Sequence, residues 1–405
     1  MILIQQAFDI DANKIDLEIP SDLDIVVDGR GLTVFPGLID PHVHFRVPGM
    51  DYKEDWRTAA SAAIAGGYTM VFDMPNTVPP TITKELLIEK KAIIDRQLKE
   101  VGIPLRYHLF FGADKPHLDQ IPLVKKSVIG IKVFMGCSTG NLVIDDDESL
   151  HAVFSLAASN DMLVAVHAED EELLKQRKHL FRQTKEYQAH SQIRNVEVAC
   201  RAVEKAIYLS QLYNTKLYIL HASTQDELAL IKKAKKANLP VFAETTPHHL
   251  FLNETAYAAL GGKAVVNPPL RTEEHQEALF AAIHEGIIDT IGSDHAPHTE
   301  MEKAKPYGEC PSGMPGIETT LALLLNAYHA DLLTLKEIVS LTSKRAQAIF
   351  NLTENQDYVL VDLNKQMHVA KSMLKTKCAW SPYLGYLLKG WPEYTILKGV
   401  CYKIN

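Results

Sequence analysis

The amino-acid sequence predicts an α/β protein: a closed (β/α)8 barrel of the TIM-like type, with a small β subdomain contributed by both ends of the chain. From residue 34 to about residue 341, short β-rich runs alternate with longer amphipathic runs, which is typical of parallel βαβ units. Eight β-rich runs can be counted, the number of strands that closes such a barrel. No Gly-x-Gly-x-x-Gly sequence opens the first crossover, which disfavours an open dinucleotide-binding sheet.

The elements of the barrel follow from this alternation. We expect its strands, in chain order, at residues 33–39, 68–73, 106–111, 128–134, 162–166, 216–220, 240–244 and 289–292. Amphipathic runs between them predict helices at 54–65, 84–99, 193–213, 224–237 and 273–285. We therefore assign residues 36–345 to the barrel.

The two ends of the chain have a different pattern. Residues 1–35 and 346–405 contain short strand-like runs with turn residues, including 358–361 and 394–397. The simplest arrangement is one small β subdomain, built from 1–35 and 346–405, beside the barrel.

Composition limits the classes of function. The chain has 405 residues, of which 46% are hydrophobic and 23% charged, as in ordinary globular proteins. A net charge of -8 argues against a nucleic-acid partner, and no apolar run reaches the roughly 18 residues of a membrane span. The start of the chain lacks the pattern of a signal peptide, and the 5 cysteines are scattered. These features predict a cytoplasmic protein with reduced thiols that acts on a small molecule.

The segment 36–46 contains the first candidate site residues, His42, His44 and Arg46. Side chains two apart on an extended strand point to one side, so the two imidazoles can clamp a metal ion. The arginine could then bind a carboxylate or phosphate beside that metal. An isolated His-x-His also occurs where histidines merely cap a core, and these residues alone leave that reading open.

Other predicted strands also end in polar residues. His167 ends the fifth, His221 the sixth and Asp294 the eighth, while Lys132 lies inside the apolar fourth strand. Each could be an ordinary polar residue by itself, but the chemistry of such barrels is carried at strand ends. Together these residues predict a metal site.

Lys132 is the least ordinary of these residues, because an unpaired buried ammonium is costly. Burial can lower its pKa until the amine is neutral. A neutral amine can take up carbon dioxide as a carbamate, whose two oxygens can bridge two cations. Four histidines, a lysine carbamate and an aspartate suit a binuclear zinc site that hydrolyses an amide or a related bond.

Over roughly residues 36–348 the sequence resembles the amidohydrolase superfamily of metal-dependent hydrolases, and within it the dihydroorotases. The motifs that carry the resemblance are His42-Val43-His44-Phe45-Arg46, Met74-Pro75-Asn76-Thr77, Asn267-Pro268-Pro269-Leu270-Arg271, Asp294-His295-Ala296-Pro297-His298-Thr299 and the glycine-rich segment 313–319.

The resemblance implies two Zn²⁺ ions per subunit, bridged by N6-carboxylated Lys132 and a hydroxide. It implies that His42 and His44 hold one ion and that His167 and His221 hold the other. Asp294 would ligate a metal and, as the catalytic residue, shuttle the proton.

The resemblance also implies a substrate. Arg46, Asn76 and His298 would bind a substrate carboxylate, and Asn267 would face a pyrimidine ring. From chemistry alone, Asn76 and Asn267 are equally well explained as turn residues beside proline. The implied reaction is the reversible hydrolysis of L-dihydroorotate to N-carbamoyl-L-aspartate in de novo pyrimidine (UMP) biosynthesis, by an enzyme that is a possible homodimer.

Two alternatives stay open. The chain could be another cyclic amidohydrolase, a dihydropyrimidinase, hydantoinase or allantoinase, whose substrates lack the carboxylate. It could also be an inactive scaffold for aspartate transcarbamoylase.

Three details complete the expectations. Some relatives bridge the metals with an aspartate, but we interpret the run Asp145-Asp146-Asp147 as the start of a helix. We interpret His248 and His249 as structural. Compared with relatives, the terminal β subdomain is expected to be trimmed.

Overall fold

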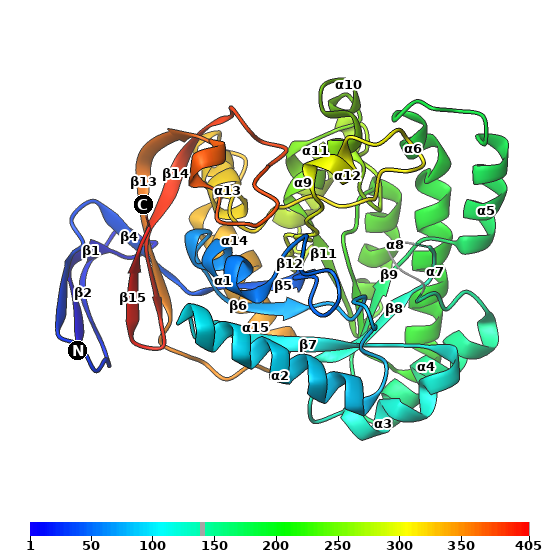
Figure 1. Cartoon of the computed structure of the whole chain (residues 1–405), viewed down its shortest axis with the longest axis horizontal. Helices are drawn as coiled ribbons and strands as arrows, with labels where there is room; N and C mark the ends of the chain where they lie inside the picture. Colours follow the sequence, from blue (N-terminus) through cyan, green and yellow to red (C-terminus); the bar gives the residue numbers. More distant parts are fainter. Residues whose placement is uncertain (138–141, 405) are drawn as a thin grey trace.

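The computed structural model describes residues 1–137 and 142–404 and contains two sheets (Figure 1). The first is an eight-stranded sheet in which each strand pairs in parallel with the next along the chain. Its strands are β5 (Leu38–Val43), β6 (Tyr68–Asp73), β7 (Arg106–Gly112), β8 (Gly130–Phe134), β9 (Val164–His167), β10 (Leu217–Ile219), β11 (Val241–Thr245) and β12 (Thr290–Ile291). The predicted barrel is confirmed.

The barrel closes just beyond the last strand. β12 and β5 lie together without a paired ladder, and a parallel bridge joins Val43 to His295 instead. The backbone N–H of His44 donates to the carbonyl of His295 at 2.8 Å. The Ser293 N–H donates to the buried Asp40 carboxylate at 3.0 Å. Closure therefore places the ends of the first and last strands side by side.

The barrel strands are apolar because both of their faces are covered. Every residue of β6 and of β8 is buried, as expected for parallel strands between a barrel interior and surrounding helices. The helices are α1 (Trp56–Ala65), α2 (Lys84–Val101), α3 (Ile121–Val124), α4 (Asp147–Ser159), α5 (Glu171–Leu180), α6 (Ala189–Ile193), α7 (Val196–Tyr213), α8 (Gln225–Lys236), α9 (Pro247–Phe251), α10 (Ala256–Leu260), α11 (Glu273–His284), α12 (Glu300–Lys303), α13 (Thr320–His329), α14 (Leu335–Val339) and α15 (Arg345–Ile349). Among the described residues, none of the helices is both long enough and apolar enough to cross a membrane.

Side-chain caps set several helix starts. The Asp146 carboxylate accepts the Ser149 N–H at 2.8 Å and caps α4, so the triple aspartate starts a helix as predicted. The predicted helix 193–213 is wrong in one respect, because α6 ends at Ile193 and α7 begins only at Val196. Asn195 lies between them in an extended conformation and caps α7, which breaks the run.

The second sheet is built from both ends of the chain. Its strands are β1 (Ile2–Phe8), β2 (Lys14–Ile19), β3 (Ile25–Asp28), β4 (Leu32–Pro36), β13 (Tyr358–His368), β14 (Leu387–Leu397) and β15 (Val400–Lys403). They lie in the order β15-β14-β13-β4-β1-β2, with β3 beside β1. Figure 1 shows this sheet beside the barrel, with both termini in it. The shared sheet agrees with the expected arrangement, but β13 and β14 each have 11 residues and are longer than the short runs expected.

The predicted strand 33–39 is wrong, because the chain changes sheet within it. β4 ends at Pro36 and pairs with β13, whereas β5 begins at Leu38 and belongs to the barrel. Gly37 lies between them, where a Cβ atom would lie 2.3 Å from Thr69 Oγ1 and 2.9 Å from Asp357 Cβ. Only a residue without a side chain fits this crossing from one sheet to the other.

Candidate metal and substrate site

A narrow buried cavity opens at the carboxyl ends of the barrel strands, where this fold places its chemistry. Nine of the ten predicted site residues line it, and the tenth, His298, contacts the arginine at its edge. The lining residues are His42, His44, Arg46, Asn76, Lys132, Phe134, His167, His221, Asn267, Asp294, Ala296, Ser312 and Gly313. The structure therefore brings together residues that are up to 252 positions apart.

His42, His44 and Asp294 form a group with the spacing of metal ligands. One oxygen of Asp294 lies 3.3 Å from His42 Nε2 and 3.1 Å from His44 Nε2. The other ring nitrogens are engaged: His42 Nδ1 lies 2.7 Å from a Glu244 oxygen, and His44 Nδ1 lies 2.8 Å from Asn76 Oδ1. Because both partners are acceptors, each Nδ1 carries the proton, and each Nε2 presents a lone pair to the centre of the group.

His167 and His221 form a second pair. His167 Nδ1 lies 2.9 Å from His221 Nε2, and these are the two atoms that face each other. The opposite nitrogen of His167, Nε2, lies 2.8 Å from a Glu169 oxygen, and Arg194 forms an ion pair with the same oxygen. The carboxylate fixes the tautomer of His167 and leaves the lone pair of Nδ1 directed at His221.

Unusual backbone conformations aim several of these side chains. His221, Asp294 and Arg46 have φ angles of 40°, 44° and 68°, in the left-handed region that non-glycine residues seldom occupy. Such strain clusters at functional sites. The sequence predicted that Arg46 projects from the same extended strand as His42. This is wrong, because β5 ends at Val43, and a turn, not strand alternation, brings the guanidinium into the cavity.

The charges in the cavity suit divalent cations. Burial lowers the pKa of His44 to about 3 and that of His221 well below its usual value, so both imidazoles are neutral. Burial would raise the pKa of Asp294, but the neighbouring histidines outweigh it and hold the pKa well below the usual range. Neutral imidazoles around an ionised carboxylate are a donor set that Zn²⁺ accepts.

Lys132 lies fully buried on β8 at the floor of the cavity, 1% exposed. Burial lowers the pKa of its ammonium to about 7. Its Nζ lies 4.5 Å from the centroid of the Phe134 ring. At neutral pH a substantial fraction of the amine is therefore unprotonated and nucleophilic.

Hydrogen-bond donors gather at one side of the cavity. Arg46 Nε donates to the carbonyl of Pro297 at 3.1 Å, and Nη2 lies 3.1 Å from His298 Nε2. Burial lowers the pKa of Arg46 only to about 10, so the guanidinium stays charged at neutral pH.

The amide of Asn267 is oriented by two hydrogen bonds. Its Oδ1 accepts from His190 Nε2 at 3.0 Å and from Ser312 Oγ at 3.1 Å.

The structure adds orienting residues that were not singled out from the sequence. Glu244 and Glu169 are both fully buried and hold metal-type histidines, and His190 orients Asn267. A signal was present for the carboxylates: Glu244 is the charged last residue of a predicted strand, and Glu169 follows His167 by two positions. His249 bonds Thr246 Oγ1 at 2.8 Å and the Pro268 carbonyl at 3.2 Å, whereas His248 Nε2 is without a hydrogen-bond partner.

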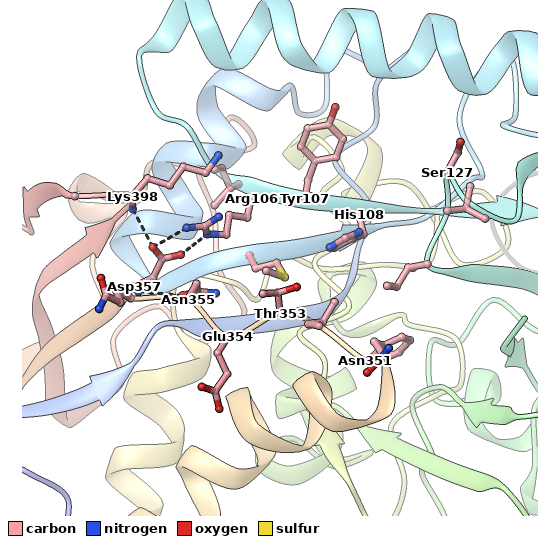
Figure 2. Close-up of a pocket in the computed structure, with 18 of the residues that line it drawn as sticks. Arg106, Tyr107, His108, Ser127, Asn351, Thr353, Glu354, Asn355, Asp357 and Lys398 are labelled. Carbon is pink, nitrogen blue, oxygen red and sulfur yellow. Dashed lines mark hydrogen bonds and ion pairs between the residues drawn. The ribbon is translucent and has the colours of Figure 1, made fainter. Parts of the chain in front are cut away.

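A larger groove, of about 1030 Å³, lies at the opposite end of the barrel near the start of β7. Figure 2 shows the Asp357 carboxylate there between Arg106 and the backbone of Lys398. The Arg106–Asp357 ion pair, at 2.6 Å, ties the first residue of β7 to the residue before β13. The groove is lined by residues of both the barrel and the terminal sheet, and none of the predicted site residues is among them.

A barrel with metal-type residues at its strand ends is the arrangement typical of TIM-like metal-dependent hydrolases, and comparisons with known proteins identify the chain as a hydrolase of such a family. Residues 33–358 match the family described as "Amidohydrolase family". The chain is 35% identical over 398 residues to a dihydroorotase of Methanosarcina mazei, covering 94% of this chain and 85% of the relative. It is 34% identical over 389 residues to a dihydroorotase of Halobacterium salinarum, covering 93% and 88%. The chain belongs to the amidohydrolase family, among the dihydroorotases.

Among solved structures, an L-hydantoinase (dihydropyrimidinase) from Arthrobacter aurescens is similar, with a TM-score of 0.91 and 23% identity. The alignment covers 99% of this chain and 95% of that chain. At this identity the likeness supports the fold.

The resemblance to the dihydroorotases that was predicted from the sequence is confirmed by the family match and by the sequence relatives.

Proposed function

We propose that the protein is a zinc-dependent dihydroorotase, which catalyses the reversible hydrolysis of L-dihydroorotate to N-carbamoyl-L-aspartate in de novo pyrimidine biosynthesis. One observation carries the proposal: a group of metal-type ligands and a set of buried cationic and amide donors share one cavity. The first suits hydrolysis of a cyclic amide, and the second suits a substrate with a carboxylate.

The ligand geometry supports two metal positions. His42 and His44 would hold one zinc ion, His167 and His221 the other, and Asp294 would complete the first. Lys132, as its carbamate, would bridge the two, which its buried position and the lowered pKa of its amine favour. When bound, the two ions supply Lewis acidity, lowering the pKa of a water molecule and polarising the amide carbonyl.

Asp294 is the residue that moves the proton. Its carboxylate lies where the two histidines converge, and its low pKa leaves it ionised and able to accept. It takes a proton from the attacking water and returns it to the ring nitrogen that leaves. Without this return the nitrogen would have to depart as a costly amide anion.

The remaining residues bind and orient the substrate. Arg46, Asn76 and His298 would receive the substrate carboxylate, with the Arg46 fork as the main charged contact. Asn76 also holds His44 through Oδ1, so the same amide links the carboxylate subsite to a metal ligand. Asn267, oriented by His190, would hold the pyrimidine ring.

The alternatives are less well supported. Hydantoinases share this fold, but a substrate without a carboxylate gives no use for the buried charge of Arg46. An inactive scaffold gives no reason for all the metal-type residues to be present and oriented in one cavity. A cytoplasmic location and a homodimer remain part of the proposal.

A substrate panel tests the function. The purified zinc-loaded protein is assayed by absorbance for cleavage of L-dihydroorotate, with hydantoin and allantoin in parallel. We expect turnover of dihydroorotate at the highest kcat/KM. A preference for hydantoin or allantoin would replace this function with that of a carboxylate-free relative, and zinc-free, inactive protein would favour the scaffold.

A further inference from the structure

Lys53 lies behind the donor side of the cavity and was not among the predicted site residues. It is 6% exposed, in the segment between β5 and α1. Its Nζ lies 3.0 Å from His298 Nδ1, a contact between residues 245 positions apart. Neither the metal-type ligands nor the proton transfer involves Lys53, so its burial beside His298 needs another explanation.

The contact fixes where the hydrogen of His298 lies. An ammonium has three donors and no acceptor, so the Nδ1 atom that faces it must present a lone pair. The ring is neutral, because burial and the charges of Arg46 and Lys53 hold its pKa well below the usual value. Its single hydrogen is therefore on Nε2, and the Ser312 carbonyl at 3.0 Å from Nε2 accepts it.

This tautomer creates an unusual arrangement with Arg46. The guanidinium also has donors only, and its Nη2 lies 3.1 Å from His298 Nε2. Two donors that face each other at this distance do not bond. The Nε2–H has the Ser312 carbonyl as its acceptor, whereas Arg46 Nη2 faces only this donor, so an anionic acceptor placed against both would bond Nη2 and share the Nε2–H with that carbonyl.

The other tautomer would have the opposite effect. With a lone pair on Nε2, His298 would accept a hydrogen bond from Arg46, and the two side chains would bond to each other. The imidazole would then repel a carboxylate through that lone pair. Control of the tautomer therefore decides whether Nε2 presents a hydrogen or a lone pair to a ligand beside Arg46.

The charge of Lys53 is already matched. Its Nζ lies 3.0 Å from Glu302 Oε1, and the other Glu302 oxygen accepts from the N–H and hydroxyl of Thr299. Tyr52 also donates to Glu302, at 3.2 Å. Since an ion pair screens the ammonium, its main effect on His298 is through the hydrogen bond.

We propose that Lys53 is a positioning residue for substrate recognition: it holds His298 in the tautomer whose Nε2–H, together with Arg46, binds the substrate carboxylate. The inference rests on the proposed function, because it names the dihydroorotate carboxylate as the ligand. Lys53 itself does not touch the substrate.

Three variants test this role. In Lys53→Met the ring can change tautomer, and we expect KM for L-dihydroorotate to rise at least about tenfold, the size of one lost charge-assisted hydrogen bond. The zinc content and kcat should change much less. Lys53→Arg, which keeps a donor-only cation, should recover most of the loss.

Lys303→Met is the matched control. Lys303 is also a buried lysine of this region, 2% exposed, but it donates to the carbonyls of Val265 and Pro311 and not to His298. We expect lower stability with an unchanged KM. An equal rise of KM in Lys303→Met and Lys53→Met, or no rise in Lys53→Met, would overturn the role of Lys53.

A neutron structure of the zinc-loaded wild-type protein without substrate gives an independent readout, which needs no variant to fold. We expect deuterium on His298 Nε2 and none on Nδ1, and deuterium on Nδ1 would overturn the inference. This result does not depend on activity. If the wild-type protein failed to turn over dihydroorotate, the proposed function would fall while the tautomer would still be decided by the neutron map.

Discussion

Replacement of Arg46 is the sharpest test of the carboxylate subsite. Arg46 is 2% exposed, and its Nε is already used by the Pro297 carbonyl. The two Nη groups are therefore the ones that can reach a substrate carboxylate. Each hydrogen bond to a charged group contributes about 1.5–3 kcal/mol, so loss of the pair in Arg46→Ala should cost about 3–6 kcal/mol, or roughly 10²- to 10⁴-fold in kcat/KM.

The assay follows the absorbance change when the dihydroorotate ring opens, with zinc per subunit measured on the same samples. Arg46→Ala should keep its zinc, because the guanidinium forms no bond with the metal-type residues. Arg46→Lys keeps the charge but loses the planar fork, so we expect an intermediate loss.

Arg106→Ala is the control for removing an arginine elsewhere. Arg106 pairs with buried Asp357 at the other end of the barrel, so its loss should lower stability and leave kcat/KM unchanged. The reasoning is refuted if Arg46→Ala retains kcat/KM for dihydroorotate within about threefold of wild type, or if Arg106→Ala loses as much as Arg46→Ala.

Three further predictions follow from other buried groups. Lys132→Ala should abolish turnover, and short carboxylic acids should partly restore it by replacing the carbamate; an electron-density map with a bare amine in a metal-loaded site would contradict the bridge. Glu244→Gln removes the carboxylate that holds the His42 ring. Zinc binding, measured by competition with a chelator, should weaken at least about tenfold, and an unchanged affinity would show that Glu244 does not support the metal ligand. Burial raises the pKa of Glu318 to about 7 from 4.5, so the stability that its proton provides is complete below about pH 4.5 and is lost as the pH rises through 7. Urea unfolding of Glu318→Gln should therefore lose less stability than wild type between these pH values, and parallel curves would contradict the raised pKa.

The barrel and its strand-end residues could be predicted because both follow from local patterns. Apolar runs bounded by helices predict parallel strands, and the topology then brings the residues at their carboxyl ends together. His167, His221 and Asp294 reach the cavity for that reason.

The rest depended on contacts that no local pattern contains. The change of sheet at Gly37 depends on the close approach of Thr69 and Asp357. The contact of Lys53 with His298 spans 245 positions. Likewise, alternation along a strand cannot foresee the positive φ of Arg46, because β5 ends three residues earlier, at Val43.

The fold alone does not separate a dihydroorotase from a hydantoinase, since a hydantoinase matches it with a TM-score of 0.91. The separation must lie in side chains that the barrel leaves free to vary. Here Arg46, Lys53 and His298 all come from segments outside the strands, after β5, before α1 and after β12. Of the metal-type residues, three lie within strands and three lie one to three positions beyond a strand end: His42, Lys132 and His167 in the first group, and His44, His221 and Asp294 in the second. If the proposed roles hold, we expect substitutions in these segments to change which substrate is accepted, while the strands keep His42, Lys132 and His167 in place.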